Sequence, residues 1–144
     1  MIFCALLPAC KEIDHEPISM ARRISGLNIP ATAVIVERID SYVDEQNNHI
    51  HDQGEFKIRL QLDSADFAKL FQEASARSPY ADVAHADSLS KTAQNRLGGI
   101  AHGLFRYRKG NGTDNFQLTT LDSDTREVLI VQINSSRDFW DDPG

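Results

Sequence analysis

The sequence predicts an α+β fold: a mainly antiparallel sheet of about five strands with one or two helices packed on one face, in the order β-β-α-(α)-β-β-β. Three observations support this prediction. Residues 55–62 alternate polar and apolar side chains without a break, as in a strand with one buried face. Residues 104–133 hold three more runs typical of strands, separated by turn residues. Between these regions, apolar side chains recur at the spacing of one helix face, at Phe67, Leu70, Phe71 and Ala74.

Composition is that of one ordinary globular domain. The chain has 144 residues, of which 41% are hydrophobic and 25% charged. A chain of this length buries about 70% of the surface that it exposes when unfolded, so it can form a core without disulfides or metal. Its 15 Lys and Arg against 21 Asp and Glu give a net charge of −6. That balance excludes general binding to nucleic acid, which depends on basic residues that neutralise phosphates.

The first predicted elements form a hairpin followed by a helix. Residues 32–39 are rich in β-branched side chains and apolar on both faces, which predicts a strand inside the sheet. A polar loop over residues 44–53 joins this strand to the one over 55–62. Asp63 can cap the helix that follows, and Ser78-Pro79 ends it.

The second half adds a short helix and three strands. Residues 88–97 form the second helix, which Gly98 stops. Strands are expected over residues 104–108, 115–121 and 127–133, and glycines near residue 111 supply a hairpin turn between the first two. The last strand is apolar on both faces, so we expect it at the centre of the sheet.

The N-terminus differs in character from the rest. Residues 1–9 are almost wholly apolar, and a polar run follows Cys10. Leu7, Ala9 and Cys10 resemble the lipobox of bacterial lipoproteins, in which an aliphatic residue and two small residues precede a cysteine that is diacylated and becomes the mature N-terminus. Pro8 departs from that pattern, and no basic residue precedes the apolar run; a translation start placed too late explains the missing basic segment.

The resemblance implies a cellular location. Residues 1–9 are the remnant of a signal peptide, and lipid on Cys10 anchors the protein to the bacterial envelope, facing the periplasm. Lys11 after the cysteine favours the outer membrane. The division of the rest of the chain comes from the residues themselves. Charge, few large apolar groups, Pro17, Gly26 and Pro30 predict a tether over residues 10–30, with a short helix between Pro17 and Gly26; 31–134 form a single domain and 135–144 a C-terminal tail. The alternative is a cytoplasmic protein in which residues 1–9 form an edge strand or a buried arm.

One loop has the character of a metal site. Alternate residues of an extended segment point the same way, so His49 and His51 can present two imidazoles to one ion, with Asp52 as a carboxylate ligand. Structural zinc sites generally need four ligands, and a solvated hairpin loop explains the same residues.

Basic and aromatic side chains mark candidate partner-binding positions. Arg106 and Arg108 lie on one face of a predicted strand, and Phe105 and Tyr107 on the other. An acidic partner can dock on such basic residues, although charge also protects edge strands from aggregation. If the strands are neighbours, Lys57 and Arg59 extend this strip. Trp140, if exposed, is a candidate hot spot.

Catalytic patterns are missing from the sequence. Cys4 and Cys10 lie in the signal-like segment, and neither a G-x-S-x-G elbow nor a phosphate-binding glycine motif occurs. We therefore expect no cofactor and a non-enzymatic, lipid-anchored binding module with a protein partner in the envelope, either an assembly partner or an inhibitor or immunity protein. The alternatives are a small metal-dependent hydrolase that uses the His49/His51 loop, and a cytosolic immunity-type protein.

Overall fold

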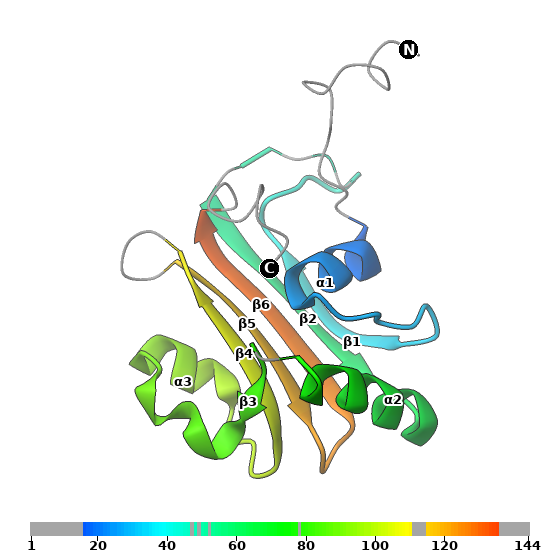
Figure 1. Ribbon diagram of the computed structural model, residues 1–144. Helices are drawn as coiled ribbons and strands as arrows, with labels where there is room; N and C mark the ends of the chain where they lie inside the picture. Colours follow the sequence, from blue (N-terminus) through cyan, green and yellow to red (C-terminus); the bar gives the residue numbers. More distant parts are fainter. Residues whose placement is uncertain are drawn as a thin grey trace.

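The fold is α+β, with a six-stranded antiparallel sheet and helices on both of its faces (Figure 1). The computed structural model describes residues 16–46, 48, 50–51, 53–77, 79–110 and 115–135. The elements, in chain order, are α1 (Pro17–Ser25), β1 (Val34–Asp40), β2 (Gln53–Gln61), α2 (Ser64–Ser75), β3 (Ala81–Asp82), the 3₁₀ helix η3 (Val83–Ser88), α3 (Lys91–Leu97), β4 (Gly103–Lys109), β5 (Phe116–Asp122) and β6 (Glu127–Ser135).

The strands lie in the order β1-β2-β6-β5-β4-β3, so β6 is central, as predicted. β2 and β6 pair along their whole length, from Gln53 opposite Ser135 to Gln61 opposite Glu127. The sheet has six strands where about five were predicted. The additional strand, β3, has two residues that pair with β4, and a pair of residues has no period that a sequence pattern can reveal.

α1 and α2 cover one face of the sheet. On β2, Phe56, Ile58 and Leu60 point to this face and are fully buried against helix residues that include Leu70 of α2. The period-two pattern of β2 and the helical stripe of α2 are therefore confirmed. Asp63 caps α2 as expected, because its side chain accepts a hydrogen bond from the Asp66 N–H.

α1 belongs to this core and not to a tether. Met20, Ala21 and Ile24 are buried, and so are Leu27 and Ile29 after the helix ends. Pro17 stands at the start of α1, and Gly26 ends it in the left-handed conformation, as the sequence indicates. The prediction of a tether over residues 10–30 is thus wrong for residues 17–29, because their apolar side chains are few but fall on one face of a short helix.

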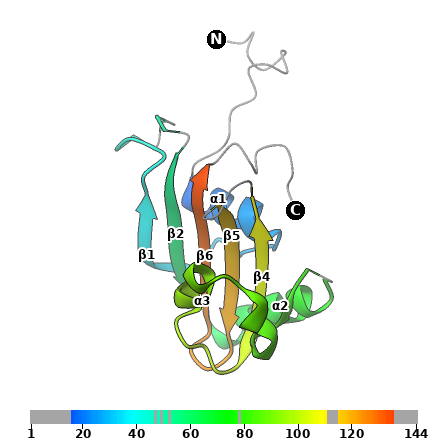
Figure 2. The same cartoon turned by 90° about the vertical axis from the view of Figure 1, so that its left-hand side faces the viewer.

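The prediction that all helices share one face is also wrong. η3 and α3 lie on the second face, where Ala93 and Leu97 pack in one cluster with Phe105, Leu118 and Val131. Figure 2 looks onto this face, with α3 in front of the sheet and α1 behind it. The physical reason is that β6 is apolar on both faces and β5 adds Phe116 and Leu118 on the second one, so each face needs cover.

Candidate protein-binding surface

The second face of the sheet is covered only in part. η3 and α3 lie over β4, β5 and β6, and in the described part of the chain no helix lies in front of β1 (Figure 2). The register places Glu37 of β1 opposite Arg59 of β2, and Ile39 opposite Lys57. Because directly paired residues of an antiparallel sheet share a face, these four side chains lie together on the uncovered part.

Charged side chains on this face form a chain across three strands, here called the charged strip: Glu37, Lys57, Arg59 and Glu127. The Lys57 Nζ lies 3.1 Å from a Glu37 carboxylate oxygen. Arg59 reaches both acids, with Nε 3.5 Å from Glu37 and Nη1 3.5 Å from Glu127. The hydrogen bond from Lys57 is the main cause that lowers the pKa of the Glu37 carboxyl, and Arg59 adds to it.

The charged strip remains accessible to a partner. The Glu37 side chain is 42% exposed and that of Arg59 34%. Ion pairs at such exposure contribute little to stability, because water and salt screen them. Charged groups of a protein partner can therefore replace the ion pairs within the strip at little cost in free energy.

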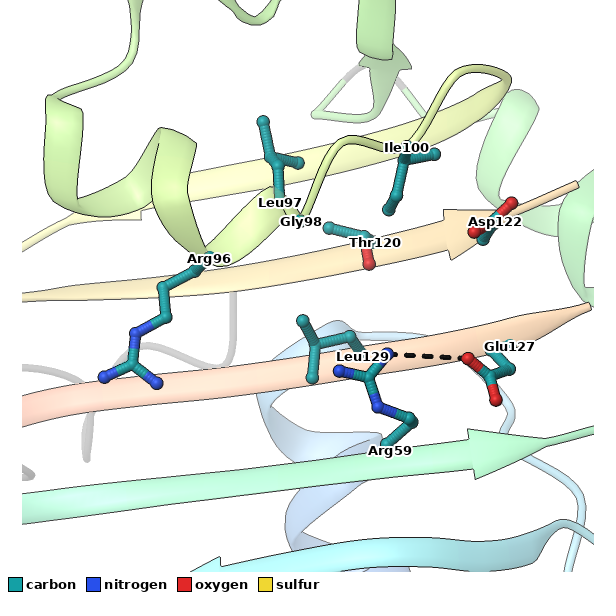
Figure 3. A pocket seen from close by; sticks show the side chains of 9 residues that line it. All are labelled: Arg59, Arg96, Leu97, Gly98, Ile100, Thr120, Asp122, Glu127 and Leu129. Carbon is teal, nitrogen blue, oxygen red and sulfur yellow. Dashed lines mark hydrogen bonds and ion pairs between the residues drawn. The ribbon is translucent and has the colours of Figure 1, made fainter. Parts of the chain in front are cut away.

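A small hollow opens where the charged strip meets α3 (Figure 3). Its volume is about 100 Å³; Leu97, Ile100 and Leu129 contribute apolar atoms, and Arg59 and Arg96 contribute guanidinium groups. Pockets for small molecules usually measure about 300–1,000 Å³. The hollow is thus of a size for one side chain of a partner.

Arg96 fixes the border between α3 and the uncovered face. Its two terminal nitrogens each lie 3.0 Å from a carboxylate oxygen of Glu55 on β2, in a bidentate pair. Such a pair fixes the orientation of both groups as well as their distance. It holds the C-terminal end of α3 beside the hollow.

The predicted basic residues do not form one surface. Lys57 and Arg59 lie in the charged strip, whereas Arg106 and Arg108 lie on the face that α1 covers. β6 and β5 separate β2 from β4, so the strands are not neighbours and the extended strip does not form. The alternation along β4 is nevertheless as predicted.

Arg106 is directed to the interior. It is 6% exposed, and its Nη1 donates hydrogen bonds to the carbonyl oxygens of Ile24, at 3.2 Å, and Ser25, at 3.1 Å. These are the last carbonyls of α1, where a cation is favourable because the helix dipole is negative there. Arg106 thus holds α1 on the sheet, while Arg108 donates to the Gln117 side chain.

Several other predicted positions lie outside the described residues: His49, Asp52, Cys10 and Trp140. His51 is described and exposed. No group of three His, Cys, Asp or Glu side chains that could hold a metal ion occurs among the residues that the structure describes.

The pattern missed one feature of this surface. Residues 32–39 were predicted to form an inner strand, but β1 is the edge of the sheet. Its large aliphatic side chains are therefore exposed, by 61% at Val34, 42% at Ile35, 55% at Val36 and 43% at Ile39. Apolar side chains on both faces are typical of an inner strand. The same pattern is expected of an edge strand that pairs with a strand of another chain.

In the described part of the chain, no helix has both the length and the apolar composition needed to cross a membrane. Comparison of the chain with protein-family models, curated proteins and solved structures gave no match.

Proposed function

We propose that the protein is a non-enzymatic, protein-binding module that lipid on Cys10 anchors to the bacterial envelope, facing the periplasm, with the outer membrane as the favoured site. The binding surface consists of the charged strip with Val34 and Ile39 beside it. One observation carries the proposal: exposed aliphatic side chains and half-exposed ion pairs lie together on the part of the second sheet face that, among the described residues, has no helix over it.

This combination is typical of a surface that binds another protein. Interfaces join a water-excluding apolar part to polar groups that fix orientation. Val34 and Ile39 supply the apolar part, and the charged strip supplies groups of both signs. The expected partner is an envelope or periplasmic protein with complementary charges and a side chain that enters the hollow beside Arg96.

Site-specific photo-crosslinking in cells tests the surface. A photoreactive residue at Val34 should give a discrete adduct with a different protein, and the adduct should weaken when Lys57→Glu and Arg59→Glu reverse the basic charges. The matched control is the same photoreactive residue at Lys69, an exposed position of α2 on the other side of the sheet. The same adducts from both positions, or no adduct with another protein from Val34, would refute this binding surface.

The anchor has its own test, because the chain offers two cysteines close together. Labelled palmitate should be incorporated into the wild type and into Cys4→Ala, but not into Cys10→Ala, which should leave the membrane fraction. Equal labelling of both variants, or none in the wild type, would remove the anchor from the proposal while leaving the binding surface to be judged by crosslinking.

A further inference from the structure

We propose that β1 pairs with β1 of a second copy of the chain in the antiparallel direction. The two copies are related by a two-fold axis that stands perpendicular to the sheet, midway between Ile39 of one copy and Ile39 of the other. The two sheets then continue as one. This inference concerns the edge of the sheet and does not depend on the lipid anchor or on the envelope partner.

The two edges of the sheet are unequal. β3 lies at one edge, pairs with two of the seven residues of β4 and leads directly into η3. β1 forms the other edge with seven residues and, among the described strands, pairs only with β2. An exposed strand edge is a template for another strand unless it is short, charged, bent by a bulge or interrupted by proline.

Protection of the β1 edge is partial. The strand, VIVERID, has three charged residues and one register shift, between Ile35 and Glu37, but neither proline nor lysine. The Glu37 carboxylate forms ion pairs with Lys57 and Arg59 of β2, so its charge lies on the side of β2 and not at the open edge. Four of the five large hydrophobic side chains that are exposed in the described part of the chain lie on this strand, and the fifth is Ile50.

Backbone alternation shows which residues face the edge. The Ser41 N–H donates to the Glu55 carbonyl oxygen at 3.0 Å, so residue 41 turns its backbone groups toward β2. In an antiparallel pair this direction alternates along the strand. Ile39 therefore also bonds toward β2, and the backbone groups of Arg38 and Asp40 point toward the edge.

Beyond the register shift, the side chains favour one register. A two-fold axis perpendicular to the sheet keeps the two faces, so it must lie midway between one residue and the same residue of the other copy. An axis at Glu37, Arg38 or Asp40 would place that charge opposite its own copy, which is destabilising. An axis at Ile39 places two isoleucines opposite each other and avoids this repulsion.

The same register brings opposite charges together. Arg38 of each copy lies opposite Asp40 of the other, and both residues belong to the face of the sheet that carries α1, since they pair with Ile58 and Phe56. These two cross-strand pairs are also the ones whose backbone groups point outward, so they exchange the hydrogen bonds of the new ladder. The Asp40 carboxylate is only 2% exposed, so its contribution is Coulomb attraction without a new hydrogen bond.

A position beside a two-fold axis allows a decisive test. Ile39→Lys and Ile39→Glu each place like charges opposite each other in the pair, so each full-length variant should have the mass of one chain, 16.1 kDa, whereas the wild type has twice that mass. An equimolar mixture of the two variants should return to twice the single-chain mass, because lysine then faces glutamate. Lys69→Glu on α2 is the control and should remain a dimer. Analytical ultracentrifugation measures all of these masses.

Disulfide trapping gives a second measurement. Residues opposite each other in a non-hydrogen-bonded pair have Cα atoms about 4.5 Å apart, which a disulfide can span. With Cys4 and Cys10 changed to Ser, Ile39→Cys should crosslink two copies under mild oxidation, whereas Val34→Cys should not. Circular dichroism of each variant checks the fold. A wild type that stays at 16.1 kDa at every concentration, or a dimer that persists in both Ile39 variants, would overturn the proposal.

Discussion

The phenol of Tyr80 donates a hydrogen bond of 2.6 Å to the carbonyl oxygen of Ser25, the last residue of α1. Arg106 donates to the same oxygen from β4. Two donors that are distant in the sequence thus meet at one buried acceptor. The attachment of α1 to the sheet depends on this junction.

Removal of either donor should destabilise the fold. Tyr80→Phe deletes the hydrogen bond to the Ser25 carbonyl, so we expect a loss of at least about 1 kcal/mol in the free energy of unfolding. Arg106→Met deletes a charged donor that serves two carbonyls, so its loss should be about 2 kcal/mol. Urea denaturation measures both. Tyr107→Phe, on the other face of the sheet, controls for the loss of a hydroxyl group.

The double variant should lose more than the sum of the two single losses. Each single change leaves the Ser25 carbonyl with one donor, and the double change leaves it buried with neither. The coupling between neighbours that share a partner is typically about 0.5–3 kcal/mol. Additive losses in a double-mutant cycle would show that the two donors act independently.

Alkaline solution should weaken the fold through Tyr80. Burial raises the pKa of Tyr80 to about 12, from its usual 10.0. As the pH rises, the unfolded chain therefore releases the phenol proton of Tyr80 before the folded protein does. The contribution of Tyr80 to the free energy of unfolding is complete below pH 10 and falls as the pH rises toward 12, by up to about 1.4 kcal/mol per pH unit. Burial raises the pKa of Tyr42 as well, so it acts in the same direction.

Denaturation midpoints between pH 9 and 12 check this expectation. Tyr80→Phe should show a shallower decline than the wild type, because one of the two groups no longer titrates. An equally steep decline in the variant would assign the alkaline sensitivity to other groups.

A Cβ atom at Gly103 should be poorly tolerated. It would overlap the carbonyl oxygen of Leu121 on the neighbouring strand β5, so the backbone must shift. Gly103→Ala should cost more than about 2 kcal/mol, as for other overpacked interiors. Gly99→Ala is the matched control: a Cβ there meets nothing within 4 Å, and its φ of +74° alone costs about 1 kcal/mol. Thermal unfolding compares the two, and a smaller effect at Gly103 would contradict the expectation.

Acid should weaken the charged strip. The hydrogen bond from Lys57 lowers the pKa of the Glu37 carboxyl in the folded protein below its value in the unfolded chain. The stability that this ionised carboxyl contributes is therefore complete above the pKa of the unfolded chain, and it is lost as the pH falls through the lower pKa of the folded protein. Glu37→Gln should remove this part of the acid sensitivity and should matter less in 1 M salt. Glu45→Gln, in the loop after β1, is the control. A loss that does not depend on salt would indicate packing as its cause.

Local patterns predicted the elements that carry their own period. The strict alternation of β2 and the apolar stripe of α2 each fix a face that must be buried, and the structure buries both. The limits of α1 were predicted, but its packing into the core was missed, because its few apolar residues are buried only once β5 and β6 lie beneath them. The position of β1 at the edge was missed for a related reason: strand order depends on contacts distant in the sequence.

The surface could be predicted only in part. Lys57 and Arg59 were named from the wet face of β2, and the structure places both there. Their partners Glu37 and Glu127 come from other strands, so no local pattern joins them. Arg106 was named as a docking residue because it lies on a basic face of β4. The sequence could not show that α1 covers that face.

The unequal edges of the sheet limit how far it can grow. A strand edge that is open at both ends of a sheet allows copies to add without end, and fibres result. Here β3 offers only two residues at one end, whereas β1 offers seven at the other, so the sheet extends more readily at β1. Pairing of β1 with itself consumes this edge in both copies. Growth through β1 would then stop at two chains and give a closed assembly.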